Sequence, residues 1–165
     1  MITLLYSLFA ILCGVIEAVL YARRGAEAFQ RNEHIDMTLQ RIAAALLAPA
    51  GAVLYIWQGS LWLVVAELIP AALVFPLFHD EAYNFTRLWL KWAEFYMLQS
   101  HYADPMAGPL PTYNPDLQGL RHAWSEYRYG YQSPTTTARN DFSGTQRTWM
   151  AVAGAGILLA LYLCL

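Results

Sequence analysis

The side chains that could carry acid–base or metal chemistry are four histidines, each with a carboxylate close by in the chain. His122 and Glu126 are four residues apart, so a helix there would place both on one face. Imidazoles and carboxylates that converge would suit a transition metal such as zinc or iron, or general acid–base work on a lipid headgroup. The candidate cluster comprises His34, His79, Asp80, His101, His122 and Glu126.

The spacing of these residues does not select one chemistry. The sequence contains neither HExxH nor CxxC, and it has no dense histidine boxes. A histidine beside an acid near a membrane surface is more often a hydrogen-bonded structural pair than a ligand set. The sequence therefore leaves open whether this chain is an enzyme and whether it holds a metal.

Two further acids, Glu17 and Glu67, interrupt long apolar stretches. Ionisable groups at membrane depth are costly and usually face a bundle interior, a cavity or a partner. Pro70 follows Glu67 by three residues and frees a backbone carbonyl one turn earlier. Glu67 is thus a candidate proton or cation site, and the alternative is a glutamic acid hydrogen-bonded to a neighbouring helix. For Glu17 a structural pairing near the membrane surface is expected.

The composition indicates which solvent these stretches need. The 165 residues are 58% hydrophobic and only 13% charged, whereas soluble domains carry roughly 25% charged residues. So little charge cannot cover a soluble globule of this size, which points to lipid. The net charge of −2 gives no general attraction to nucleic acid, and both cysteines lie in apolar stretches, which argues against a disulfide framework.

The apolar stretches predict an all-α, polytopic integral membrane protein with four transmembrane helices in one membrane domain. A helix needs about 20 mostly apolar residues to cross the hydrocarbon. No basic residue precedes the first stretch, which favours an uncleaved helix over a signal peptide. The expected spans are residues 1–22, 37–57, 61–78 and 148–165.

The basic residues predict the topology. In a four-span arrangement all ten lysines and arginines fall on one side of the membrane. The positive-inside rule then places both connecting segments in the cytoplasm and both termini outside. The multi-pass membrane is taken to be a bacterial inner membrane, a guess from size and short links.

The long segment 79–147 between the last two spans is where the specific function is expected. Within it, aromatic residues recur at three- and four-residue intervals from Phe85 to Tyr96, opposite Arg87, Lys91 and Glu94. This pattern predicts a cytoplasmic amphipathic helix at the membrane interface. The alternative is a cytoplasmic extension of the third span that packs on its neighbours.

Three classes of function fit these features. The first is a non-enzymatic membrane component, such as a subunit, an assembly factor or a protein that interacts with lipids or a partner. The second is an interfacial enzyme that uses the histidine and carboxylate cluster on a lipid-like substrate. The third is a proton or cation transporter or channel built around Glu67. The expected partners are membrane lipids, together with a second copy or another membrane protein; small residues at every fourth position, such as Ala151 and Ala155, would let helices approach closely.

Overall fold

The computed structural model describes residues 2–24, 56, 59, 61–102, 115–131 and 142–164, and these ranges contain four helices and no strand. The helices are α1 (Ile2–Arg24), α3 (Leu61–Tyr102), α4 (Pro115–Glu126) and α5 (Gly144–Leu163). This confirms the predicted all-α class. The span expected at 37–57 lies almost entirely outside the described residues.

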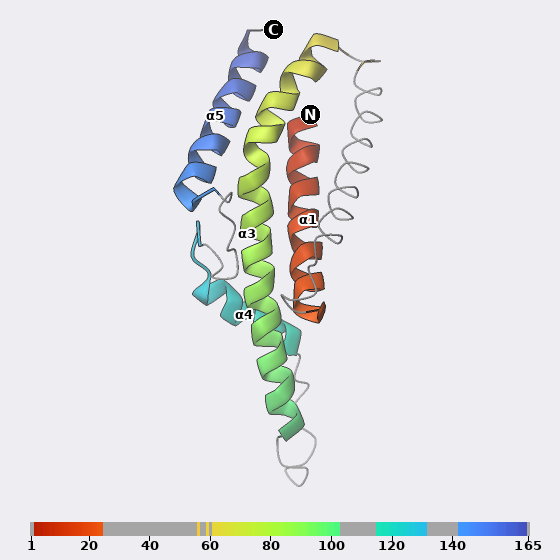
Figure 1. Ribbon diagram of the computed structural model, residues 1–165, viewed down its shortest axis with the longest axis vertical. Coiled ribbons are helices and arrows are strands. Elements are labelled where there is room, and N and C mark those ends of the chain that lie inside the picture. Colours follow the sequence, from red (N-terminus) through yellow and green to blue (C-terminus); the bar gives the residue numbers. More distant parts are fainter. Residues whose placement is uncertain are drawn as a thin grey trace.

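Helix α3 is the spine on which the other helices pack. Figure 1 shows α1 and α5 on opposite sides of its upper half, while α4 crosses its lower part. The N- and C-terminal ends both lie toward the upper end of the molecule in this view. The upper half of α3 is therefore in contact with α1 on one side and α5 on the other.

The amphipathic segment predicted from Phe85 to Tyr96 is not a separate interfacial helix. It is an extension of the third span, the alternative that the sequence left open, and α3 runs unbroken for 42 residues. Pro70 and Pro76 lie inside the helix, and the next proline is Pro105, beyond its end. No proline or glycine lies from Leu77 to Tyr102, and the 42 residues of α3 extend over about 63 Å. A hydrocarbon core is only about 30 Å thick, so the second half of α3 projects beyond any bilayer that the first half could cross.

Glycines allow the closest contacts with α3. A Cβ at Gly14 of α1 would lie 2.2 Å from the carbonyl oxygen of His79, and one at Gly119 of α4 would lie 2.6 Å from the backbone nitrogen of Ala93. Both helices therefore rest on the backbone of α3, where only glycine fits. Above Gly14, the rings of Tyr6 and Phe75 lie 5.4 Å apart and fill the interface between α1 and α3.

Helix α5 begins with a capping box. The Ser143 hydroxyl accepts from the backbone N–H of Gln146, whose side chain accepts from the backbone N–H of Ser143. Of the small residues that follow, Ala151 and Gly154 are buried, Gly154 against α3, while Ala155 and Gly156 are exposed. The predicted small-residue repeat therefore does not form one buried face.

Among the described residues, α1 is the one helix long and apolar enough to cross a membrane, over Ile2–Arg23. Only 33% of the residues in its most apolar stretch are buried inside the structure. The predicted count of four spans is not confirmed. Helix α3 carries Glu67 and the run His79-Asp80-Glu81, and α5 opens with the polar residues 144–148, so both are less uniformly apolar than α1.

Candidate functional site

A network of ionisable side chains joins α1, α3 and α5 halfway along α3; it is called the central network and consists of Glu17, His79, Asp80, Glu81, Tyr127 and Arg147. His79 lies at its centre. Its Nε2 is 3.1 Å from Oε2 of Glu17, and its Nδ1 is 2.8 Å from Oδ1 of Asp80. The ring of Phe75, one turn earlier, stacks on the imidazole at 5.5 Å between centroids. Both imidazole nitrogens are thus held by carboxylates from two helices.

Arg147 closes the network from the first turns of α5. Its side chain is only 1% exposed, and its guanidinium lies 2.8 Å from Asp80 and 3.9 Å from Glu81. It also donates weakly to the carbonyl oxygen of Tyr131 at 3.5 Å. An arginine is rarely fully buried unless it is paired, so the two carboxylates of α3 account for its position. Its Nε has no partner among the described residues.

Glu81 extends the network to the turn that follows α4. It accepts hydrogen bonds from the Tyr127 hydroxyl and from the backbone N–H of Gly130, the latter at 3.1 Å. Gly130 has a φ of 73°, a conformation that favours glycine. Burial raises the pKa of Tyr127, and the hydrogen bond to Glu81 is the second-largest cause of this shift. The phenol therefore stays neutral and keeps its proton for Glu81.

A second polar cluster lies near the upper end of the bundle; it is called the upper cluster and consists of Thr3, Ser7, Glu67 and Tyr162. Glu67 is fully buried at its centre. Its Oε2 accepts from the backbone N–H of Thr3 at 3.0 Å, and its Oε1 accepts from the Tyr162 hydroxyl at 2.5 Å. Because the N–H of Thr3 is among the first of α1, Glu67 caps this helix end from another helix. The Ser7 hydroxyl donates back to the carbonyl of Thr3.

The upper cluster and the central network are built alike. Each takes side chains from α1, α3 and α5, and each contains a buried or half-buried acid of α3. The twelve residues from Glu67 to His79 correspond to about 18 Å along α3. Polar contacts therefore join the three helices at two levels. The distance between these levels is smaller than the thickness of the hydrocarbon core of a bilayer, about 30 Å.

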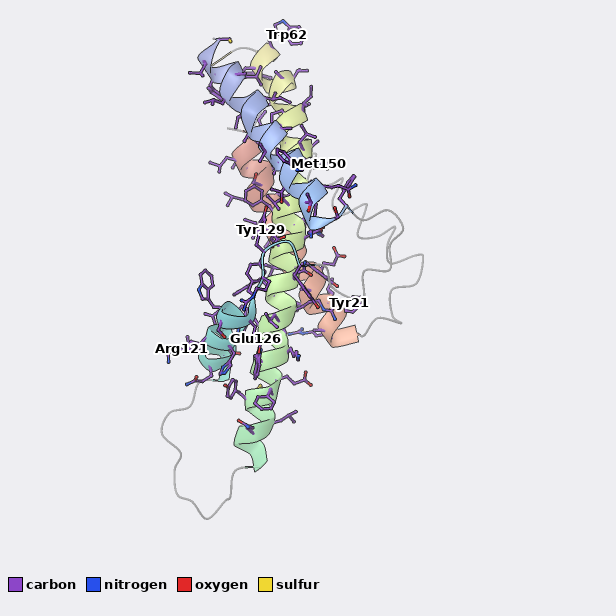
Figure 2. All side chains as sticks on the ribbon, turned by 90° about the vertical axis from the view of Figure 1, so that its left-hand side faces the viewer. Tyr21, Trp62, Arg121, Glu126, Tyr129 and Met150 are labelled. Atoms are coloured by element: carbon purple, nitrogen blue, oxygen red, sulfur yellow. The ribbon has the colours of Figure 1, made fainter. Side chains whose placement is uncertain are left out.

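A third group surrounds His122 on α4. The Tyr96 hydroxyl lies 2.7 Å from its Nδ1, and Trp92 stacks on the imidazole at 4.5 Å between centroids. The indole N–H of Trp92 donates to Glu126 at 3.1 Å. These contacts dock the polar face of α4 on the aromatic face of α3, as Figure 2 shows for Glu126 beside the lower part of α3.

A pocket of about 510 Å³ lies between the lower part of α3 and the turn after α4; it is called the cationic pocket. It carries three basic side chains and one acid. Arg87 is held over the Tyr21 ring at 4.7 Å, while Arg128 donates to the carbonyl oxygens of Ser125 and Tyr127. The lining residues are Asn84, Arg87, Leu88, Lys91, Glu126, Tyr127, Arg128 and Tyr131.

The structure brings the predicted candidates together only in pairs. His79 and Asp80 lie in the central network with Glu17. His122 and Glu126 lie together on α4, against Trp92 and Tyr96 of α3. Trp92 is thirteen residues beyond His79 on α3, or about 20 Å. His34 and the side chain of His101 lie outside the described residues. Within the part of the chain that is described, no three histidine, cysteine or acidic side chains are arranged to hold a metal ion.

Several residues of these groups could not be identified from the sequence. Arg147 was counted only among the basic residues of one membrane side, yet it is the buried ion-pair partner of Asp80. Tyr127 and Tyr162 gave no signal, because their carboxylate partners are 46 and 95 residues away. The one available hint was the tripeptide His79-Asp80-Glu81 at the end of an apolar stretch, which requires partners from other helices.

Comparison of the chain with protein-family models, curated proteins and solved structures finds no match. The function must therefore be argued from the arrangement of the side chains themselves.

Proposed function

We propose that this protein is a non-enzymatic integral membrane component, a small subunit, assembly factor or lipid- and partner-binding protein. In this proposal its helices cross the membrane four times, with the termini outside and the charged segments in the cytoplasm. The observation that carries the proposal is the distribution of polar and apolar side chains on α1, α3 and α5. It is the reverse of that in a water-soluble bundle.

The apolar side chains of these helices point outward. Leu8 is 56% exposed, Ile69 59% and Leu159 61%. In contrast, the charged and polar side chains Glu67, Thr3 and Arg147 are at most 5% exposed. A water-soluble protein exposes single apolar residues, but a belt of leucine and isoleucine around buried charges needs an apolar solvent. Hydrocarbon meets this need, since polar groups in a membrane protein are paired inside the bundle.

The same contacts favour a structural role over catalysis. In the central network both nitrogens of His79 already face carboxylates, so the imidazole has no nitrogen directed at a substrate. In the upper cluster both carboxylate oxygens of Glu67 accept hydrogen bonds from neighbouring helices. These interactions hold helices together, which is what a membrane component that presents its cytoplasmic half to a partner requires.

Membrane integration is tested first. Cells that express the full chain are lysed, and their membranes are washed with alkaline carbonate. We expect the protein to stay in the pellet until detergent is added. The protein is then purified in mild detergent, and the mass and the subunit composition of the purified particle are measured. Recovery of the chain from the carbonate wash, without detergent, would contradict the proposal.

The topology is tested with cysteine labelling. The native Cys164 is exposed at the end of α5, and we expect an impermeant maleimide to label it from outside intact cells. Both proteins carry Cys13→Ser, because Cys13 is the other free cysteine. The matched variant C164S/S125C then moves the remaining thiol to α4, where Ser125 is exposed, and this thiol should react only after lysis. Labelling of position 125 in intact cells would refute the orientation.

A further inference from the structure

We infer that the cationic pocket binds the phosphate of an anionic phospholipid headgroup. The inference rests on the proposed membrane location and assigns a ligand class to a surface of the cytoplasmic half. Its first support is charge. Three basic side chains and one carboxylate line the pocket, which leaves a local net charge of +2, whereas the whole chain carries −2.

The basic side chains come from two elements that line the same pocket. Arg87 and Lys91 are four residues apart on α3, so they lie on one face of the helix, and Arg128 approaches from the turn after α4. The hydrogen bonds of Arg128 go to neutral carbonyl oxygens, and among the described residues neither Lys91 nor Arg128 forms an ion pair. Their charges are therefore not neutralised by a described carboxylate. A phosphate oxygen accepts charge-assisted hydrogen bonds from such groups.

The depth of the pocket selects a lipid over a soluble phosphate compound. Asn84, its uppermost lining residue, is six residues beyond Phe78, where the predicted third span ends. This is about 9 Å along the helix, and headgroups occupy the layer just outside the hydrocarbon. Tyr127 and Tyr131 also line the pocket, and tyrosine favours this layer.

The size of the pocket fits the same ligand. Its volume of about 510 Å³ lies within the range of about 300–1,000 Å³ that small-molecule sites occupy. Glu126 is held by the Trp92 indole at one edge, so the negative group of the lining is already engaged. The pocket thus offers two exposed cations and Arg87 to an anion that enters from the surface.

The experiment uses the full chain purified in a neutral detergent. It is mixed with equal amounts of phosphatidylglycerol and phosphatidylcholine that have the same acyl chains, and the bound lipids are counted by native mass spectrometry. We expect phosphatidylglycerol to be preferred. The variant K91Q/R128Q should lose about 30-fold of this preference, since each basic residue near an anionic lipid contributes about fivefold.

The control variant R23Q/R121Q also removes two charges. Arg23 and Arg121 are exposed and do not line the pocket, so this variant should retain the preference. An equal loss in both variants would mean diffuse attraction and would overturn the inference.

A further arm adds glycerol 3-phosphate as a competitor. If it displaces phosphatidylglycerol at equal concentration, the site recognises a soluble phosphate and the lipid assignment is wrong. A chain that resists the carbonate wash but shows no lipid preference would refute this inference alone. Release into the carbonate wash would instead refute the membrane proposal.

Discussion

Replacing Gly14 by alanine tests the central contact of the fold. The new Cβ would lie 2.2 Å from the carbonyl oxygen of His79 and 3.0 Å from the backbone nitrogen of Tyr83. Both obstacles are backbone atoms of α3, which cannot rotate away as a side chain can. Because an ordinary contact needs about 3.5 Å, α1 must move outward by about 1 Å. That movement would lengthen the 3.1 Å contact between Glu17 and His79.

The expected magnitude follows from two opposing terms. Overpacking of a close contact costs about 1–3 kcal/mol, while alanine in place of glycine inside a helix gains up to about 1 kcal/mol. Gly156 on α5 supplies a matched control, because a Cβ there would meet nothing within 4 Å. G156A therefore contains only the favourable term. G14A should be less stable than G156A by about 1–3 kcal/mol, the overpacking term alone.

The free energy of unfolding is measured for both variants and the native chain by titration with dodecyl sulfate in mixed micelles, followed by tryptophan fluorescence. The comparison between the two alanine variants removes the helix-propensity term, which they share. If G14A unfolds at the same detergent fraction as G156A, the helices do not approach as described, and the contact between α1 and α3 is wrong.

The other predictions concern the buried polar groups and use the same unfolding assay. R147Q leaves the carboxylate of Asp80 without its buried partner and should cost about 2–4 kcal/mol, and less than the sum of the single losses should be seen when it is combined with D80N; strict additivity would show that the pair is not coupled. E67Q keeps the shape of the side chain but removes one of two acceptor oxygens, so it should cost about 1–3 kcal/mol, and an unchanged stability would contradict the helix-capping role. The pKa of Tyr127 is raised in the folded protein, so the neutral phenol stabilises the fold below about pH 10, its usual pKa, and this contribution falls as the pH rises further. The native chain should therefore lose more stability than Y127F between pH 8 and pH 11, and parallel losses would refute the assignment.

The sequence alone determined the class of structure, and it predicted lipid as the solvent. Few charged residues and long apolar stretches favour helices that satisfy their own backbone groups, and the described residues are all-helical. Among the described helices, α1 alone is long and apolar enough to cross a membrane. Glu67 and Glu17 were recognisable as acids that need partners, because each interrupts an apolar run. The extent of α3 was partly predictable too. The amphipathic periodicity correctly predicted a helix from Phe85 to Tyr96. The sequence did not decide whether this helix continues from the third span, because the charged residues around Asp80 could equally have marked a break between two helices.

The partners of these acids were decided by tertiary structure. Arg147 meets Asp80 across 67 positions of sequence, and Tyr162 meets Glu67 across 95. No local periodicity encodes such pairs, since they depend on how the helices are rotated and how closely Gly14 and Gly154 let them approach. For the same reason the histidines, which look alike in the sequence, separate into different groups. His79 lies in the central network, and His122 lies against the aromatic face of α3. The packing of the helix that carries each histidine, α3 for His79 and α4 for His122, determines which side chains surround it.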